Sequence, residues 1–291
     1  YRATDRLSGQ PVAVKVLKPE HQRSAARFTR EAELLAKLQH PNIVSYIAHG
    51  TTASGQSYLV MEWLDGEDLG QRLAAGVLTL RESLTCLQAV AAALAVAHSQ
   101  GVVHRDIKPS NLLLRAGQLA RATLLDFGIA RPMHPSQDVG TTQAGLGTPL
   151  YMSPEQARGD RDIGPSADVF SIGCVIYECL TGRAPFMAAH AVAVLARILS
   201  EEALPIRILR PQLPAALEGL LARMLAKDPR QRPQDAGQLL RDLQQVMAQV
   251  PVHPLIVARE GGPAEGLGRA EEHGLLIRQP AGLPPPAGLV E

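Results

Sequence analysis

Four polar residues near the middle of the chain have the types and spacing that a phosphate chemistry needs. The run His104–Leu113 reads HRDIKPSNLL, so the acid Asp106 stands two residues before the cation Lys108 and five before the amide Asn111. A second acid, Asp126, follows a short apolar stretch. An acid that receives a hydroxyl proton, a cation for a phosphate, and an amide with an acid for magnesium are what phosphoryl transfer to an alcohol requires.

The elements that must position these residues begin with a small, β-rich N-terminal region. Short apolar runs predict strands at Tyr1–Thr4 and Val12–Leu17, which flank a turn that contains Gly9. Two further strands are predicted at Ile43–Ala48 and Tyr58–Trp63 around a Ser-Gly turn. This pattern favours a small antiparallel sheet.

One helix, over residues 24–38, is predicted between these strands. Phe28, Glu31 and Leu35 fall on one side of it at helical spacing, so Glu31 is a charge on the inward face and needs a partner. Lys15, near the end of the second strand, is the predicted partner. Taken alone, Lys15 would be better interpreted as a lysine at a solvated strand end, and it is the inward Glu31 that favours the pair.

The later part of the chain predicts helices. A stripe of inward residues that alternate four and three apart runs from Leu80 to His98. The run Asp168–Leu180 is apolar all round, which predicts a helix that is buried on every side. Leu213–Leu225 and Ala236–Val246 predict amphipathic helices.

We therefore expect an N-terminal lobe over 1–64, a larger lobe over 65–248 and a Pro/Gly-rich tail or linker over 249–291. The net charge of +1 gives no reason to expect a nucleic-acid partner. The cysteines lack metal-type spacing and predict buried, reduced thiols, which fits a cytoplasmic location. We expect no apolar run near the ~20 residues that cross a bilayer, and a membrane anchor outside the chain stays open.

The chain resembles the eukaryotic-like (Hanks-type) protein kinases, specifically serine/threonine kinases of the bacterial type. The resemblance runs from Tyr1 to about Gln245 and is carried by five motifs in order. They are AVK at Ala13–Lys15, REAELL at Arg30–Leu35, HRDIKPSN, DFG, and GTPLYMSPE at Gly147–Glu155. The resemblance implies an α+β, two-lobed fold: a small antiparallel β lobe with one helix, and a larger, mainly α-helical lobe.

The resemblance also implies transfer of the γ-phosphate of ATP to Ser/Thr hydroxyls of proteins, with Mg²⁺ as the metal. Asp106 would be the catalytic base, and Lys108 would meet the transferring phosphate. Asn111 and Asp126 would hold Mg²⁺, a hard cation that prefers oxygen ligands. A turn or cap role is the ordinary alternative for a single Asp in a loop.

Further residues would bind the rest of the nucleotide. Lys15 would hold the α- and β-phosphates, with Glu31 fixing its ammonium group. For the adenosine, the resemblance implies Ala13 and Leu113 against the ring, Met61 before the hinge, Glu62 to Leu64 as the hinge, and Asp68 on the ribose hydroxyls. Ordinary packing is the alternative for each of these, and it is strongest for Asp68.

The segment after Asp126 would be the activation segment. Thr141 and Thr142 are its predicted phosphorylation sites, and Arg105 is the cation with which such a phosphate would pair. Thr148 would bond to the catalytic base and help to select Ser/Thr substrates. The alternative is that these threonines keep an exposed loop polar.

Three structural supports follow from the resemblance. Glu155 would form a buried pair with Arg232, and Asp168 would hold the backbone just before the catalytic base. A plain helix N-cap explains Asp168 nearly as well. His104 and Phe127 would stack in the hydrophobic spine that joins the lobes.

The chain departs from the family in one respect: no glycine-rich loop precedes Lys15. Backbone donors to the β- and γ-phosphates would then be missing, and a single preorganised donor is worth ~3 kcal/mol. We therefore expect this chain, as it stands, to bind ATP weakly. A fragment of a longer kinase is favoured over a degenerate one because Asp106, Asn111 and Asp126 are all present.

Two other functions compete with the protein kinase. One is a pseudokinase, a scaffold or interaction module with the same fold. The other is a small-molecule kinase of the aminoglycoside type, which HRD in place of HGD and the GTPLYMSPE motif disfavour. The expected partners are protein substrates with Ser/Thr, together with a second copy of the chain for phosphorylation in trans.

Overall fold

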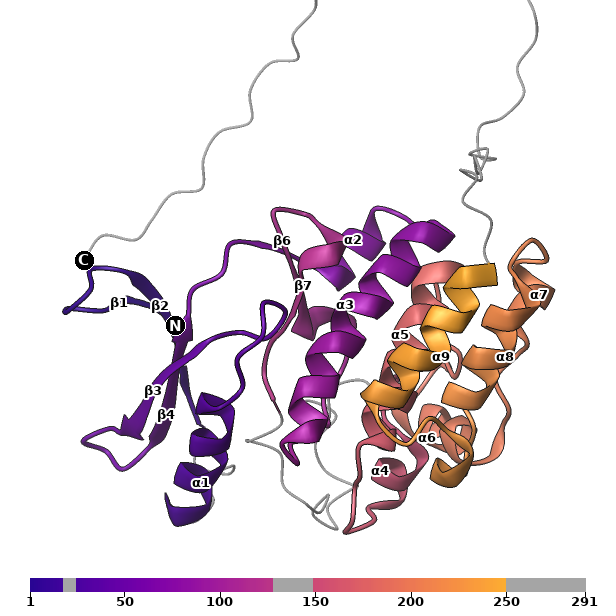
Figure 1. Ribbon diagram of the computed structural model, residues 1–291. Coiled ribbons are helices and arrows are strands. Elements are labelled where there is room, and N and C mark those ends of the chain that lie inside the picture. Colours follow the sequence, from indigo (N-terminus) through magenta and orange to yellow (C-terminus); the bar gives the residue numbers. More distant parts are fainter. Residues whose placement is uncertain (18–24, 128–148, 250–291) are drawn as a thin grey trace, which may run out of the picture. The chain divides into compact units, whose positions relative to one another are not determined.

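The structure, a computed structural model, describes residues 1–17, 25–127 and 149–249 (Figure 1). The chain divides into two units, Tyr1–His253 and Pro254–Glu291, and the second lies outside the described residues. Thr141, Thr142 and Thr148 also lie outside them.

The first lobe is an antiparallel sheet with one helix, as predicted. Its strands are β1 (Arg2–Thr4), β2 (Pro11–Val16), β3 (Tyr46–Thr51) and β4 (Ser57–Glu62), in the order β1-β2-β4-β3. The helix is α1 (Ala25–Ala36), and it buries its apolar face in a small core with side chains of β3 and β4 and with Leu17, the residue after β2. The strand that carries the AVK motif, β2, lies between β1, at one edge of the sheet, and β4.

The predicted strand at Ile43–Ala48 is wrong at its start, because its first apolar residues join the two lobes. Ile43 forms an isolated parallel bridge with Leu124, and the Val44 amide donates to the Leu124 carbonyl at 3.0 Å. The Leu124 amide donates in turn to the Asn42 carbonyl at 2.8 Å. These buried residues serve the junction between the lobes, and β3 begins only afterwards.

The second lobe is mainly helical. Its helices are α2 (Leu69–Ala74), α3 (Leu80–Ser99), α4 (Pro154–Arg158), α5 (Ser166–Thr181), α6 (Ala191–Ser200), α7 (Ile206–Leu209), α8 (Ala215–Met224) and α9 (Ala236–Gln249). Short 3₁₀ turns lie at Pro109–Asn111, Leu119–Arg121 and Pro229–Gln231. A small antiparallel sheet has the order β5 (Gly66–Asp68), β6 (Leu112–Arg115), β7 (Ala122–Leu124).

The helices α3 and α5 form the centre of this lobe's core. All of α5 from Ala167 to Tyr177 is buried, as its uniformly apolar sequence predicts. Over the described residues, α3 is one helix that is long and apolar enough to cross a membrane, which corrects the expectation that no run approaches that length. More than half of its most apolar window is buried inside the lobe, so core packing accounts for its composition.

All three cysteines, Cys86, Cys174 and Cys179, are free and buried. Burial raises the pKa of the Cys86 thiol to about 12 and raises the pKa of the other two thiols as well. Because the thiolate is the reactive form, we expect the native protein to leave a thiol reagent such as DTNB unreacted at pH 8. All three thiols should react once the protein is unfolded in guanidinium. Rapid reaction of any thiol in the native protein would contradict this burial.

Candidate active site

The loop between α3 and β6 carries the HRD sequence, and a buried carboxylate holds its backbone. Asp168, on α5, accepts hydrogen bonds from the amides of His104 at 2.7 Å and Arg105 at 2.8 Å. Arg105 has a φ of 64°, a left-handed conformation that costs a non-glycine residue ~1–3 kcal/mol. The two bonds to Asp168 hold this strained residue directly before Asp106.

Asp168 is ionised in this environment. Burial alone would raise its pKa, but the hydrogen bonds from His98 and the His104 amide outweigh burial and lower the pKa below its ordinary value. The N-cap of α5 is Pro165, and Asp168 lies three residues further on. The plain N-cap explanation of Asp168 is therefore wrong, and its partners are the catalytic-loop amides.

The carboxylate of Asp106 lies in a small polar cluster. Lys108 Nζ is 3.2 Å from Asp106 Oδ2, and Asn111 Nδ2 donates to the same oxygen at 3.0 Å. Asn111 Nδ2 also donates to the Asp106 backbone carbonyl at 2.7 Å. The structure thus brings together the acid, cation and amide that the sequence places within six residues, and it leaves the amide oxygen of Asn111 facing away from Asp106.

Strand pairing brings Asp126 beside Asn111. Leu112 and Leu124 are partners in the β6–β7 ladder, and the Leu125 amide donates to the Asn111 carbonyl at 2.9 Å. Asp126 follows with a φ of 50°, again left-handed and strained for a non-glycine residue. The backbone is thus strained at the residue that carries this acid, and such strain is common at functional sites.

His104 fastens this turn to the catalytic loop. Its Nδ1 accepts from the Asp106 amide at 3.2 Å, and its Nε2 donates to the Leu125 carbonyl at 2.7 Å. Burial lowers the pKa of His104, which agrees with a neutral ring that makes both bonds. The ring also contacts Phe127, with centroids 4.6 Å apart and the ring planes tilted by 44°, so the two residues predicted to stack in the spine are neighbours whose rings are not parallel.

Lys15 forms an ion pair with Asp126. Its Nζ lies 2.9 Å from Asp126 Oδ1, and both side chains are more than one-third exposed. Glu31, the predicted partner of Lys15, is partly buried on α1. The cation predicted for the phosphates is thus paired with the acid predicted for magnesium, and the role of Glu31 stays a prediction.

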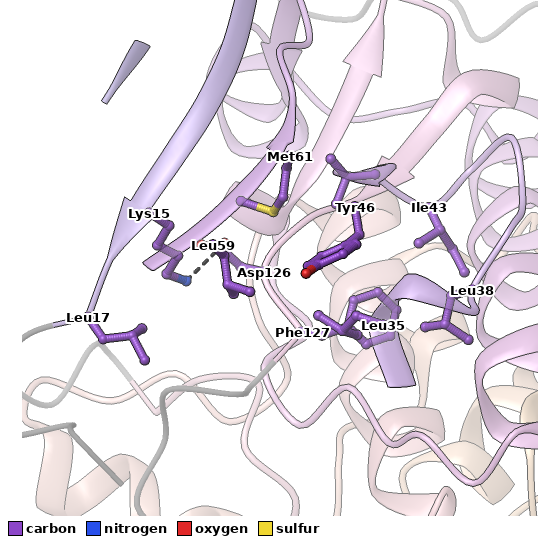
Figure 2. Close-up of a pocket in the computed structure, with 11 residues that line it drawn as sticks. Lys15, Leu17, Leu35, Leu38, Ile43, Tyr46, Leu59, Met61, Asp126 and Phe127 are labelled. Carbon is purple, nitrogen blue, oxygen red and sulfur yellow. Dashed lines mark ion pairs between the residues drawn. The ribbon is translucent and has the colours of Figure 1, made fainter. Parts of the chain in front are cut away.

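A pocket opens next to this ion pair, and Figure 2 shows the side chains around it. Lys15 and Asp126 supply its charged groups, and Met61 and Tyr46 are among the side chains around them. The other lining residues are Leu17, Leu35, Leu38, Ile43, Val44, Leu59 and Phe127. Met61, the predicted residue before the hinge, is thus part of the wall of this pocket.

Of the residues predicted to bind adenosine, Met61 lines this pocket and the others do not. Ala13 pairs with Met61 across β2 and β4. It stands two residues before Lys15 in β2, so the two side chains lie on the same face of the strand. Leu113 lies opposite Asp68 across β5 and β6. Asp68 is the N-cap of α2 and accepts from the Gln71 amide at 2.9 Å, which supports its structural interpretation.

The predicted hinge is held at its first residue. Glu62 accepts from the Ser45 amide at 2.8 Å and pairs with Arg115 at 2.6 Å. Its carboxylate is therefore already engaged, and its backbone amide donates to the Ser45 carbonyl at 2.9 Å. Leu64 is partly buried two residues later.

Glu155 and Arg232 form the expected buried ion pair. Arg232 Nη1 and Nη2 lie 2.7 and 2.9 Å from the two Glu155 carboxylate oxygens, and the Arg232 side chain is 0% exposed. The guanidinium also donates to three backbone carbonyls, those of Ser166, Ala226 and Lys227. The pair thus ties α4 to the start of α5 and to the segment after α8.

Gln156, a residue not predicted from the sequence, joins α4 to the loop that carries the HRD sequence. Its Nε2 donates to the Arg105 carbonyl at 2.9 Å, while its Oε1 accepts from the Ser153 amide at 3.1 Å. Ser153 is the N-cap of α4, and the two residues form a capping box. The Ser-x-x-Gln spacing was the signal available, although it does not indicate the bond to Arg105.

A second hollow lies against the catalytic loop. Asp106 and Lys108 line it on one side, and Leu150, Tyr151 and Met152, which precede α4, line it on another. The remaining lining residues are Gly70, Arg105, Ile107, Pro109, Ser110, Pro149, Gln156 and Ser171. The acid of the HRD sequence therefore faces an open space of its own, which shares no lining residue with the pocket beside Lys15 and Asp126.

The sequence of this chain matches a known protein family. Residues 1–248 match the model of the protein kinase domain. The chain belongs to the protein kinase domain family. Within this family it is 36% identical over 250 residues to the serine/threonine-protein kinase PknB of Mycobacterium leprae (strain TN), a match that covers 84% of this chain and 40% of that protein.

Other protein kinases give the same result. The chain is 35% identical over 288 residues to the serine/threonine-protein kinase PknD of Mycobacterium tuberculosis (strain ATCC 25618 / H37Rv), covering 97% of this chain and 41% of that protein. It thus spans about two-fifths of the length of these curated relatives. The crystal structure of Rad53 1–466 in complex with AMP-PNP matches with a TM-score of 0.68 and 26% identity, over 83% of this chain and 60% of that one. The two-lobed kinase fold predicted from the sequence is confirmed.

Proposed function

We propose that this chain is the catalytic domain of a serine/threonine protein kinase that transfers the γ-phosphate of ATP to protein hydroxyls. The observation that carries the proposal is the cluster in which Asp106 Oδ2 lies 3.2 Å from Lys108 Nζ and 3.0 Å from Asn111 Nδ2. A carboxylate held between a cation and an amide has a fixed orientation. It can therefore accept a proton from a hydroxyl at a defined place.

Asp106 is the proposed base in this mechanism. A substrate hydroxyl that enters the second hollow donates its hydrogen bond to the Asp106 carboxylate, which orients the oxygen for attack and takes the proton. Lys108 neutralises the charge of the phosphate as it moves. Neither residue has to move far, because the loop backbone is already held by Asp168.

The residues present fit a magnesium nucleotide. Among the described residues no cluster of three or more His, Cys, Asp or Glu forms a metal site, but Mg²⁺ typically takes one or two protein oxygens and completes its shell with phosphates and water. Asp126 and the amide oxygen of Asn111 are such donors. When bound, the metal would neutralise charge on the phosphates. Lys15 would then bind the α- and β-phosphates in place of its pairing with Asp126.

The remaining assignments are part of the same proposal. The adenosine would lie between Ala13 and Leu113 beside the hinge at Glu62 and Leu64, and Asp68 has the weakest claim because it caps α2. Regulation by phosphorylation of the activation segment, pairing with a second copy and a cytoplasmic location also belong here. So do the lobe boundaries at residue 64 and residue 248.

Phosphate transfer to defined acceptors tests the proposal. The natural protein that contains this chain would be incubated with γ-labelled ATP, Mg²⁺ and either a generic basic protein or an aminoglycoside. We expect label on serine or threonine of the protein acceptor, identified by phosphoamino acid analysis, and none on the aminoglycoside. No transfer to any acceptor at millimolar ATP would replace this function with that of a pseudokinase scaffold.

A further inference from the structure

The side chain of Gln156, on α4, is held at both of its polar atoms. Its Oε1 accepts from the Ser153 amide at 3.1 Å and from the Ser153 hydroxyl at 3.2 Å, and its Nε2 donates to the Arg105 carbonyl at 2.9 Å. A backbone N–H can only donate and a backbone carbonyl can only accept, so one orientation of the carboxamide satisfies both backbone partners. The flipped orientation satisfies neither of them.

The capping box of α4 does not by itself require a glutamine. The third residue of such a helix has to accept a hydrogen bond from the N-cap amide, and glutamate does this as well as glutamine. The α3 helix is an example, because Glu82 accepts from the amide of its N-cap, Thr79, at 2.8 Å. The bond from Gln156 to Arg105 uses the amide nitrogen, which is the atom that the capping box does not use and that a glutamate lacks.

The Arg105 carbonyl belongs to the peptide unit directly before Asp106, and this unit is planar. The N–H of the same unit, that of Asp106, donates to His104 Nδ1 at 3.2 Å. Gln156 and His104 therefore hold the two sides of one rigid plane that leads into the α-carbon of Asp106. Without Gln156, the plane is held on one side and follows a residue, Arg105, whose φ of 64° is already strained.

Gln156 is oriented by a segment that borders the second hollow. Leu150, Tyr151 and Met152 line that hollow, and Ser153, the residue that orients the Gln156 carboxamide, follows them directly. A displacement of this segment would move Ser153 and with it the donor on Arg105. The position of one wall of the hollow is thus linked to the backbone that carries Asp106.

We propose that Gln156 is a positioning residue for phosphoryl transfer, which links the segment before α4 to the peptide plane that carries Asp106. The proposal rests on the function proposed above. Gln156 acts through the Arg105 carbonyl and is not among the residues proposed to bind the nucleotide. Its loss should therefore lower kcat and leave the KM for ATP unchanged.

The variant Gln156→Glu of the natural protein separates this role from helix capping. It keeps the oxygen that accepts from Ser153, but it places a second acceptor against the Arg105 carbonyl. We expect kcat to fall by roughly 10–100-fold with little change in the KM for ATP, since a small misplacement of a catalytic group has effects of this size. If Gln156 served the capping box alone, the variant would keep the wild-type kcat.

Two further variants control for the added charge. Gln238→Glu makes the same change on α9, where the Gln238 side-chain oxygen accepts from the Gln234 amide at 2.8 Å and a glutamate can do the same. This control should match the wild type. Gln156→Met removes the donor without adding a charge, so it should lose kcat as Gln156→Glu does. A loss confined to Gln156→Glu would assign the effect to the charge and overturn the positioning role.

Hydrogen exchange of the Asp106 amide is a second readout, and it needs no catalytic activity. This amide lies in the plane that Gln156 holds, so in folded Gln156→Glu it should exchange roughly 5-fold faster than in the wild type, the effect of losing one hydrogen bond. In Gln238→Glu the rate should be that of the wild type. Mass spectrometry with fragmentation to single residues would measure it.

The outcomes separate the two proposals. If the wild type transfers no phosphate, the proposed function fails, while the exchange rate still tests the link to Asp106. If the wild type is active and a folded Gln156→Glu protein keeps its kcat, or if the Asp106 amide exchanges as in the wild type, the positioning role is overturned. Should Gln156→Glu fail to fold, Gln156→Met takes its place with the same expected loss of kcat and the same faster exchange.

Discussion

Replacement of Asp106 by Asn should lower phosphate transfer by about 10²–10⁴-fold, the usual contribution of a positioned general base. The amide of Asn has the shape of the carboxylate and can still accept from Asn111 Nδ2, which lies 3.0 Å from Asp106 Oδ2. What it loses is the charge beside Lys108 and the ability to take a proton. The fold should therefore survive a change that removes the chemistry.

Initial rates of transfer to a protein acceptor would check this prediction. Asp160→Asn is the matched control, because it is the same chemical change at an aspartate that forms an exposed ion pair with Arg158. Such exposed pairs contribute ~0–1 kcal/mol to stability. We expect the control to keep the wild-type rate. If Asp106→Asn, shown by its thermal melting to be folded, also keeps that rate, another group is the base.

Replacement of Arg232 by Met should destabilise the fold by ~3–5 kcal/mol, because it leaves the buried carboxylate of Glu155 without its counter-charge. Three backbone carbonyls lose a donor at the same time. For a domain of this size the expected fall in Tm is roughly 6–20 °C. The pair lies outside the Asp106 cluster, so its loss is measured first as a change in stability.

Thermal unfolding of a double-mutant cycle would check this effect. Glu155→Gln combined with Arg232→Met removes the unpaired charge, so the double variant should be more stable than Arg232→Met alone. Arg223→Met, which breaks the exposed pair with Asp242, should change the stability by no more than ~1 kcal/mol. If Arg232→Met destabilises the fold no more than this surface control does, Glu155 finds another partner or becomes neutral at little cost in free energy.

The sequence predicted the short-range parts of the site well. Asp106, Lys108 and Asn111 lie within six residues of one another, so the loop alone brings them together, and the apolar run before Asp126 predicts the strand that delivers it. The α5 helix was predicted because its whole circumference is apolar. In each case the signal is local: spacing within one element is enough to predict where the residues lie relative to one another.

The long-range contacts were harder to predict, because their two halves lie far apart in the sequence. His98 stands on the inward stripe of α3, which indicates that it needs a partner, yet Asp168 lies 70 residues away. The start of β3 was misplaced for the same reason, since Ile43 pairs with Leu124 across the lobes. Alternation of apolar residues shows that a side chain is buried but not what it is buried against.

The magnesium dependence of phosphate transfer tests the central claim most directly. Transfer from ATP to a protein acceptor would be measured over a range of Mg²⁺ concentrations for the wild type and for Asp126→Asn. If Asp126 holds the metal, the wild type should require Mg²⁺, and the variant should need far more of it or stay inactive at saturation. Equal Mg²⁺ requirements in the two proteins, with equal rates, would contradict the proposed site.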